Sequence, residues 1–260
     1  MALKTADLLV ADYMTPRPFA VKKDTRLQDA VNIMAEHGIG NLVVLQRNRP
    51  AGILTERGIL DHLVTHKKIQ SIPLSKIELN GFTPVNIGFK VIDAAKLMIS
   101  RKTRLLVFDD NRFVGIITAT DLVRAFRRTS INPDLQNVVS RNPYSVDYNS
   151  SVLESCGIMK ARRIGSVIVS RNGRPYGIFT ERDLTVNVLQ NGSDIKNPVG
   201  GYCTTPLISS EIGIKGRDAA GKMSKNNVKR LVITKAGKIY GIVTSRDVVD
   251  AFQQGFSDEG

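Results

Sequence analysis

Apolar residues alternate along this 260-residue chain between two kinds of spacing. Leu27, Ala30, Val31 and Met34 follow the i, i+3, i+4, i+7 rule of an amphipathic helix. Residues 42–45 form a short apolar run before a turn, which is typical of a buried strand. The pattern predicts a β-α-β-β-α unit, with an extended segment at 19–21, a helix from 27, strands at 42–45 and 52–54, and a second helix over 55–64.

The same unit recurs along the chain. A Gly-apolar-apolar-Thr element begins at Gly52 and returns at nearly equal intervals at Gly115, Gly177 and Gly241. Such self-similarity is the mark of a repeat protein, in which each copy is one supersecondary unit. The sequence therefore predicts four repeats.

A longer period lies above this one. An ungapped shift that brings Pro18 onto Pro143 also brings the sequence Thr-Glu-Arg at 55–57 onto the same sequence at 180–182. The first repeat thus matches the third, and the unit duplicated last was a pair. We expect an α/β fold with repeats at 11–64, 74–128, 135–189 and 198–252, forming modules 11–128 and 135–252 joined by a turn-rich segment.

Composition narrows the class of protein. Apolar residues make up 42% of the chain, yet no apolar run approaches the ~20 residues that span a bilayer. The first seven residues lack the pattern of a secretion signal. Two cysteines, Cys156 and Cys203, are too few for a disulfide framework or a zinc site. We expect a cytoplasmic protein without membrane contact.

The charge balance is strongly basic. Lysine and arginine number 37 against 24 acidic residues, which gives a net charge of +13. Such an excess favours a polyanionic partner such as RNA, because clustered cations release counterions from phosphates. A charged surface that only keeps the protein soluble is the alternative, and net charge alone does not separate the two.

The repeated order of elements, with Gly-apolar-x-Thr-x-x-Asp at the end of the second strand, resembles the cystathionine-β-synthase (CBS) domain. The resemblance covers 11–252 and implies that two CBS repeats pack as a Bateman module. The four-repeat layout is similar to that of the γ subunit of AMP-activated protein kinase. CBS modules sense adenine nucleotides, so the resemblance implies AMP, ADP or ATP as a regulatory ligand, with no cofactor required.

The Thr-x-x-Asp element is the main candidate for ligand binding. A carboxylate can accept from both hydroxyls of a ribose, and a helix start suits phosphate. The alternative is a helix-capping box, and one element can serve both roles. The first repeat has Gly58 in place of the aspartate, so we expect an empty or weak half-site there. The candidate residues are Thr118, Thr120, Asp121, Thr180, Arg182, Asp183, Thr244, Arg246 and Asp247.

The resemblance implies that each cleft also takes residues from the other repeat of its module. Asp121 is expected to meet 15–19 and 40–42, Asp183 to meet 205–207 and 229–230, and Asp247 to meet 143–144 and 163–166. Ordinary core packing and cations at helix ends are the alternatives. The further candidates are Thr15, Pro18, Pro143, Thr205, Arg104, Arg163, Lys229 and Arg230.

Paired cations lie at three of the four hairpin turns, and the second repeat has two aspartates there. These pairs could dock on ribosomal or other RNA and restrain translation, although a solvated loop explains any single turn. The chain lacks an aromatic RNA-binding signature. The pairs are Arg47 with Arg49, Arg171 with Arg174, and Lys235 with Lys238.

Catalysis finds no support in the sequence. The three histidines follow no metal-ligand or triad spacing, and no phosphate-binding loop is present. We expect a non-catalytic regulatory protein, monomeric or homodimeric. A regulatory subunit of a separate enzyme or transporter is a further alternative.

Overall fold

The computed structural model describes residues 8–257, so residues 1–7, on which the prediction about a secretion signal falls, lie outside the described residues. The chain divides into two compact units. Unit 1 comprises 1–18, 82–143 and 208–260, and unit 2 comprises 19–81 and 144–207. Each unit therefore contains the helices of one repeat from each module: the second and fourth in unit 1, the first and third in unit 2.

Unit 2 confirms the element order that the apolar pattern predicts. The helix over 27–34 and the strands at 42–45 and 52–54 are present, each slightly longer than predicted. A π-helix at Leu184–Leu189 continues the last helix of the third repeat. The elements are β2 (Ala20–Lys22), α2 (Leu27–Glu36), β3 (Asn41–Gln46), β4 (Arg49–Thr55), α3 (Glu56–His66), β9 (Ser145–Asp147), α6 (Val152–Ala161), β10 (Ser166–Arg171), β11 (Arg174–Thr180) and α7 (Glu181–Asp183).

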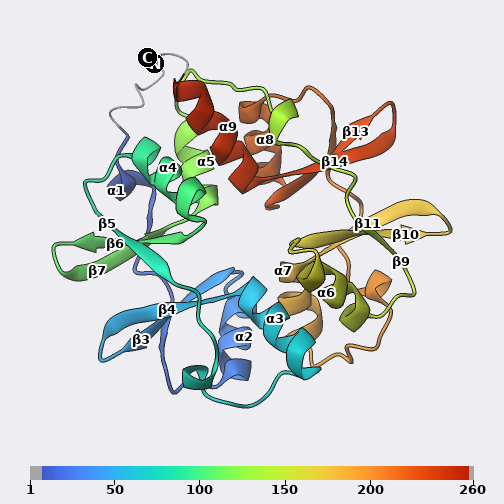
Figure 1. Cartoon of the computed structure of the whole chain (residues 1–260), viewed down its shortest axis with the longest axis horizontal. Coiled ribbons are helices and arrows are strands. Elements are labelled where there is room, and N and C mark those ends of the chain that lie inside the picture. Colours follow the sequence, from blue (N-terminus) through green and yellow to red (C-terminus); the bar gives the residue numbers. More distant parts are fainter. Residues whose placement is uncertain (1–7, 258–260) are drawn as a thin grey trace. The chain divides into compact units, whose positions relative to one another are not determined.

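Unit 1 repeats this order and adds short strands from the segments that lead into the first and third repeats. Its helices gather in one group (Figure 1). The elements are α1 (Val10–Tyr13), β1 (Thr15–Pro16), β5 (Phe82–Asn86), α4 (Val91–Arg101), β6 (Arg104–Asp109), β7 (Arg112–Ile117), α5 (Ala119–Phe126), β8 (Ser140–Arg141), β12 (Ser209–Glu211), α8 (Gly216–Lys225), β13 (Arg230–Lys235), β14 (Lys238–Thr244) and α9 (Ser245–Ser257).

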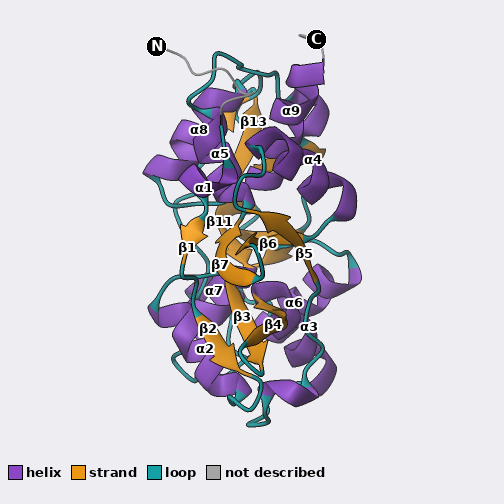
Figure 2. Cartoon of the chain, turned by 90° about the vertical axis from the view of Figure 1, so that its left-hand side faces the viewer, coloured by secondary structure: helices purple, strands orange, loops and turns teal. Residues whose placement is uncertain are grey.

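Four small sheets result, one for each repeat. In each sheet a parallel strand lies beside an antiparallel hairpin, as in β2-β3-β4 and β11-β10-β9 of unit 2. The unit 1 sheets gain a fourth strand, with the orders β1-β7-β6-β5 and β12-β13-β14-β8. Figure 2 shows β1 beside β7 at the edge of the first of these sheets. Short apolar strands flanked by helices therefore build the predicted mixed α/β fold.

The recurring glycine of each hairpin lies where a leading segment crosses the second strand. Ile53 bridges Asn80 and Ile178 bridges Thr204, while β1 and β8 pair with β7 and β14. A Cβ atom on Gly177 would lie 2.7 Å from the carbonyl oxygen of Thr204. The crossing backbone therefore excludes any side chain at these positions.

Each unit has its own hydrophobic core, formed by the buried faces of its helices and sheets. The predicted core positions Leu27, Ala30, Val31 and Met34 are fully buried in unit 2. Among residues 8–257, no helix combines the length and apolar character needed to cross a bilayer.

Candidate functional site

The Thr-x-x-Asp elements form helix caps in the second, third and fourth repeats. The Oδ2 atom of Asp121 accepts from the backbone N–H and the hydroxyl of Thr118, at 2.9 and 2.7 Å. The corresponding distances from Thr180 to Asp183 are 2.8 and 2.6 Å, and from Thr244 to Asp247 they are 2.8 and 2.7 Å. The capping role is therefore confirmed, and it uses one carboxylate oxygen of each aspartate.

The second carboxylate oxygen distinguishes the three copies. In the second repeat, the Oδ1 atom of Asp121 accepts from the Arg124 guanidinium at 3.2 Å. The same guanidinium also donates to the carbonyl oxygen of Tyr13. Because the Arg124 side chain is 60% exposed, this contact can be exchanged with solvent at small cost.

The third repeat satisfies its aspartate from inside the unit. The Oδ1 atom of Asp183 accepts from the Thr204 hydroxyl at 2.8 Å and from the Asn187 amide at 3.2 Å. Asn187 also donates to the carbonyl oxygen of Tyr202 at 2.9 Å, which fixes its orientation. The Asp183 carboxylate, only 6% exposed, is thus held in a closed hydrogen-bond network.

The fourth repeat leaves its aspartate open. Among residues 8–257, no hydrogen bond reaches the Oδ1 atom of Asp247, and the residue is half-buried. Burial raises the pKa of Asp247, with the bonds from Thr244 opposing this shift and nearby Asp250 adding to it. Burial likewise raises the pKa of Asp121 against the bonds from Thr118.

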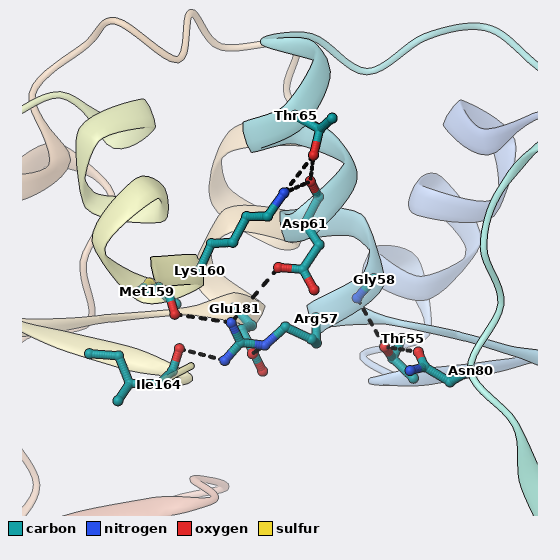
Figure 3. A network of polar contacts seen from close by, with 10 residues as sticks. All are labelled: Thr55, Arg57, Gly58, Asp61, Thr65, Asn80, Met159, Lys160, Ile164 and Glu181. Carbon is teal, nitrogen blue, oxygen red and sulfur yellow. Dashed lines mark hydrogen bonds and ion pairs between the residues drawn. The ribbon is translucent and has the colours of Figure 1, made fainter. Parts of the chain in front are cut away.

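The first repeat replaces the missing carboxylate with an amide. The Thr55 hydroxyl donates to the Oδ1 atom of Asn80 at 2.7 Å, and the Gly58 N–H donates to the Thr55 hydroxyl at 3.0 Å (Figure 3). Asn80 lies in the segment that leads into the second repeat, outside the Thr-x-x-Asp elements. A comparison of those elements therefore could not identify it. The predicted weakness of this half-site stays a prediction.

The structure brings half of each expected constellation together within a unit. Thr15 pairs with Ile116 and lies in unit 1 with Pro18 and Asp121; Pro143 lies there with Asp247. In unit 2 the hydroxyl of Thr205 donates to the Tyr176 carbonyl, beside the Thr204 contact to Asp183. The turns expected to complete the sites, 40–42, 163–166 and 229–230, belong to the other unit in each case, so these pairings stay predictions.

The candidate cations of those turns differ in exposure. Arg163 is exposed and lies in the left-handed region, with φ of 54°. Arg104 and Arg230 are half-buried at the first positions of β6 and β13, and Lys229 directly precedes β13. Arg230 pairs in register with Thr244, so within unit 1 this cation lies beside the Thr-x-x-Asp element of its own repeat.

The arginines that follow the threonines contact helix ends of the other repeat in their unit. Arg246 donates to the Met98 carbonyl at 2.6 Å, and the Arg182 guanidinium lies against Gly38. Thr120 occupies the equivalent position in the second repeat. Whether Arg182, Arg246 and Thr120 also contact a nucleotide stays a prediction.

Arg57, at the same position in the first repeat, was absent from the predicted site. Its guanidinium donates to the carbonyls of Met159 and Ile164, at 3.1 and 2.5 Å, and forms an ion pair with Glu181 at 2.7 Å (Figure 3). The identical Thr-Glu-Arg sequences at 55–57 and 180–182 were the available signal. Their shared role in joining two repeats became visible only in the packing of α3 against α6 and α7.

The six hairpin cations predicted to dock on a polyanion are all exposed, and tyrosines lie near the cations of two of these turns. The Arg171 guanidinium lies over the rings of Tyr148 and Tyr176, at 5.0 and 5.8 Å from their centroids. Lys235 lies 5.9 Å from the ring centroid of Tyr240. No such ring contact is recorded for Arg47 or Arg49 among the described residues.

Metal-ligating groups and reactive thiols are two features of catalytic sites that can be examined among the described residues. Within 8–257, no three potential metal-ligating side chains form a group. Burial raises the pKa of Cys156 to about 12 and that of Cys203 to about 11, with Glu181 and Asp183 adding to the respective shifts. Neither thiol is therefore activated as a nucleophile at neutral pH.

Four segments of the chain, 10–65, 80–128, 135–189 and 199–254, match the profile of the CBS domain. They cover most of the sequence, so the chain belongs to the CBS-domain family. The resemblance inferred from the repeated Gly-apolar-x-Thr-x-x-Asp pattern is confirmed.

Relatives and solved structures share this layout. Protein MJ1404 of Methanocaldococcus jannaschii is 25% identical over 92% of this chain, which spans 61% of that relative's length. The crystal structure of MJ1225 from the same organism is 19% identical and covers 94% of this chain and 100% of its own, with a TM-score of 0.79. A conserved protein from Pyrococcus horikoshii, 18% identical with the same coverages, has a TM-score of 0.64. These structures confirm the fold of four CBS repeats paired into two modules.

Proposed function

We propose that this chain is a non-catalytic regulatory protein that binds adenine nucleotides at its Thr-x-x-Asp elements and transmits their occupancy to a partner. The observation that carries the proposal is the unshared Oδ1 atom of Asp247, which lies beside a capped helix start. Family membership supports it, as does the shared fold of MJ1225, itself proposed as an archaeal homologue of γ-AMPK.

The chemistry of the element suits a nucleotide in two ways. The Oδ1 atom can accept from the two hydroxyls of a ribose, and charge-assisted bonds of this kind are short and strong. The first N–H groups of α9 carry the partial positive charge of a helix start, which suits phosphate. Arg230, in register with Thr244, adds a cation to this end of the sheet.

Regulation follows if the bound and free forms of the repeats differ in their affinity for the nucleotide. A ligand shifts a conformational equilibrium only by its difference in affinity for the two states. In this proposal, AMP, ADP or ATP favours one arrangement of the repeats, and a partner protein or assembly in the cytoplasm responds to that arrangement. The partner can be a separate enzyme or transporter, of which this chain would be a regulatory subunit.

Isothermal titration of the purified chain with AMP, ADP and ATP tests the proposal. We expect heat from at least one nucleotide, and its loss in the triple variant Asp121→Asn, Asp183→Asn, Asp247→Asn. The matched control, Asp109→Asn with Asp110→Asn, removes carboxylates from an exposed hairpin turn and should bind as the wild type does. Absence of heat with all three nucleotides would contradict the proposal.

A second candidate function is docking on RNA, including ribosomal RNA, by which the chain would restrain translation. It is favoured by the tyrosines beneath the exposed cations of the hairpin turns in the third and fourth repeats. Cations bind phosphates without sequence preference, and aromatic rings provide faces on which unpaired bases stack. The net charge of +13 gives the attraction its range.

Fluorescence anisotropy with a single-stranded RNA across a salt series tests this function. Arg171→Gln with Arg174→Gln should weaken binding about tenfold and lower the salt slope by about 0.7 for each lost phosphate contact. Arg47→Gln with Arg49→Gln removes the same charge from a turn without tyrosines and should have a smaller effect. Equal losses would leave only non-specific attraction, and no binding at low salt would remove this function.

A further inference from the structure

Resting on the proposed function, we infer that the four repeats differ in their affinity for a nucleotide. The fourth repeat binds it first, whereas the protein's own side chains block the ribose acceptor of the third repeat and replace that of the first. A ribose hydroxyl needs a carboxylate oxygen that can accept its hydrogen bond. The cap takes Oδ2 in the same way at Asp121, Asp183 and Asp247, so the repeats differ in what occupies Oδ1.

At the fourth repeat a ribose hydroxyl finds an acceptor that no described side chain shares. Asp247 is half-buried, and its Oδ1 atom accepts no hydrogen bond within 8–257. A ligand there displaces no hydrogen-bond donor of the described residues. Because a hydrogen bond to a charged acceptor is stronger than one between neutral groups, the gain is retained in full.

At the third repeat the ligand must first displace protein groups. The Thr204 hydroxyl and the Asn187 amide both donate to the Oδ1 atom of Asp183. A ribose that forms two hydrogen bonds to Asp183 must first break these two hydrogen bonds from Thr204 and Asn187 to the same carboxylate. The Asn187 amide is also held by the Tyr202 carbonyl, so it does not simply turn away. The third repeat is therefore closed by contacts within unit 2.

The second repeat lies between these cases, and the first is closed by substitution. Arg124 makes one contact to Asp121 from a mostly exposed position, so a ligand displaces it easily. In the first repeat Asn80 receives the Thr55 hydroxyl in place of a carboxylate (Figure 3). A Cβ atom on Gly58 would lie 3.6 Å from the Asn80 Oδ1 atom, so an aspartate there would meet an amide already in position. The expected order of affinity is fourth, second, third and first.

Titration of single variants with the nucleotide that binds the wild type tests this order. Asp247→Asn should weaken the tightest binding phase tenfold or more, whereas Asp183→Asn should leave that phase within twofold. The double variant Asn187→Leu with Thr204→Val should strengthen a weak phase about tenfold, because it removes these two donors to the Oδ1 atom of Asp183 and keeps the number of side-chain heavy atoms. Thr185→Val is its matched control, since that hydroxyl of unit 2 donates to the Glu181 carbonyl and not to an aspartate, and it should leave the weak phase unchanged.

Thermal unfolding of each variant without ligand separates binding from folding. Loss of the tightest phase in Asp183→Asn but not in Asp247→Asn would overturn the order while leaving nucleotide binding intact. An unchanged weak phase in a folded Asn187→Leu, Thr204→Val variant would also overturn it. Absence of binding in the wild type would instead overturn the proposed function, and the order with it.

Discussion

The two compact units are built from equivalent helices, but different side chains form the contact between the two repeats within each unit. Eight residues after the threonine of each repeat, unit 1 has Phe126 and Phe252, and unit 2 has Leu63 and Val188. The two phenylalanine rings stack with their centroids 5.1 Å apart, and Phe256 lies against Phe126 at 5.7 Å. Unit 1 thus joins its repeats through an aromatic cluster, whereas unit 2 uses smaller aliphatic side chains.

In unit 2 a polar contact between the repeats, here called the polar joint, centres on Arg57 and Glu181. At the two positions after the threonine it carries the sequence Glu-Arg in both repeats, where unit 1 has Ala-Thr and Ser-Arg. Arg57 joins the first repeat to the third through Glu181 and two main-chain carbonyls. A shared backbone arrangement therefore accepts either a large apolar contact or a part-buried ion pair between its repeats.

The largest expected effect is at the aromatic cluster of unit 1. Phe252→Ala should lower the free energy of unfolding by about 3–5 kcal/mol, because it removes a fully buried ring and leaves a cavity. Phe252→Leu introduces an aliphatic side chain like those at the equivalent positions of unit 2. It should lower the free energy of unfolding by only about 1–2 kcal/mol. Urea unfolding followed by circular dichroism measures both. A negligible loss in Phe252→Leu would show that ring stacking contributes nothing specific to unit 1.

The next largest effect is at the polar joint of unit 2. Arg57→Ala should lower the free energy of unfolding by about 1–3 kcal/mol, because Glu181, whose side chain is 14% exposed, loses this ion pair and two carbonyls lose the Arg57 donor. The double variant Arg57→Ala, Glu181→Ala should recover part of the loss. Arg174→Ala, at an exposed turn, is the control and should cost under about 0.5 kcal/mol. A loss as small as the control's would contradict a specific joint.

The smallest effect concerns pH and unit 1. Burial raises the pKa of Asp121 above the ordinary aspartate value of about 3.9, so the folded state binds its proton more tightly than the unfolded state. The stabilising contribution of this protonation is present at low pH and is lost as pH rises through the folded-state pKa. The unfolding free energy of Asp121→Asn, relative to the wild type, should therefore rise as pH increases from about 4 toward neutral.

Urea midpoints at several pH values measure this trend, and Asp109→Asn at an exposed turn controls for the loss of one charge. A difference between Asp121→Asn and wild type that falls as pH rises would contradict the sign of the shift. Such a result would place the bonds from Thr118 above burial as the dominant influence on this carboxylate.

The repeats, their helices and strands, and the helix caps could all be predicted from the amino-acid sequence. Each depends on residues close together in the chain: the spacing of Leu27, Ala30, Val31 and Met34 defines one face of α2, and Thr118 and Asp121 are three positions apart. The recurrence of the Gly-apolar-apolar-Thr element in four copies made the repeats recognisable, because a chance match would not recur at domain-length intervals.

The tertiary structure alone decided which repeats share a core and what reaches each aspartate. Asn80, Thr204 and Arg57 act on groups 20 or more residues away in the chain, through contacts set by how strands cross and helices pack. No local pattern encodes such contacts, because they depend on the geometry of segments that sequence spacing does not relate. For the same physical reason, four elements with similar sequences acquire different surroundings.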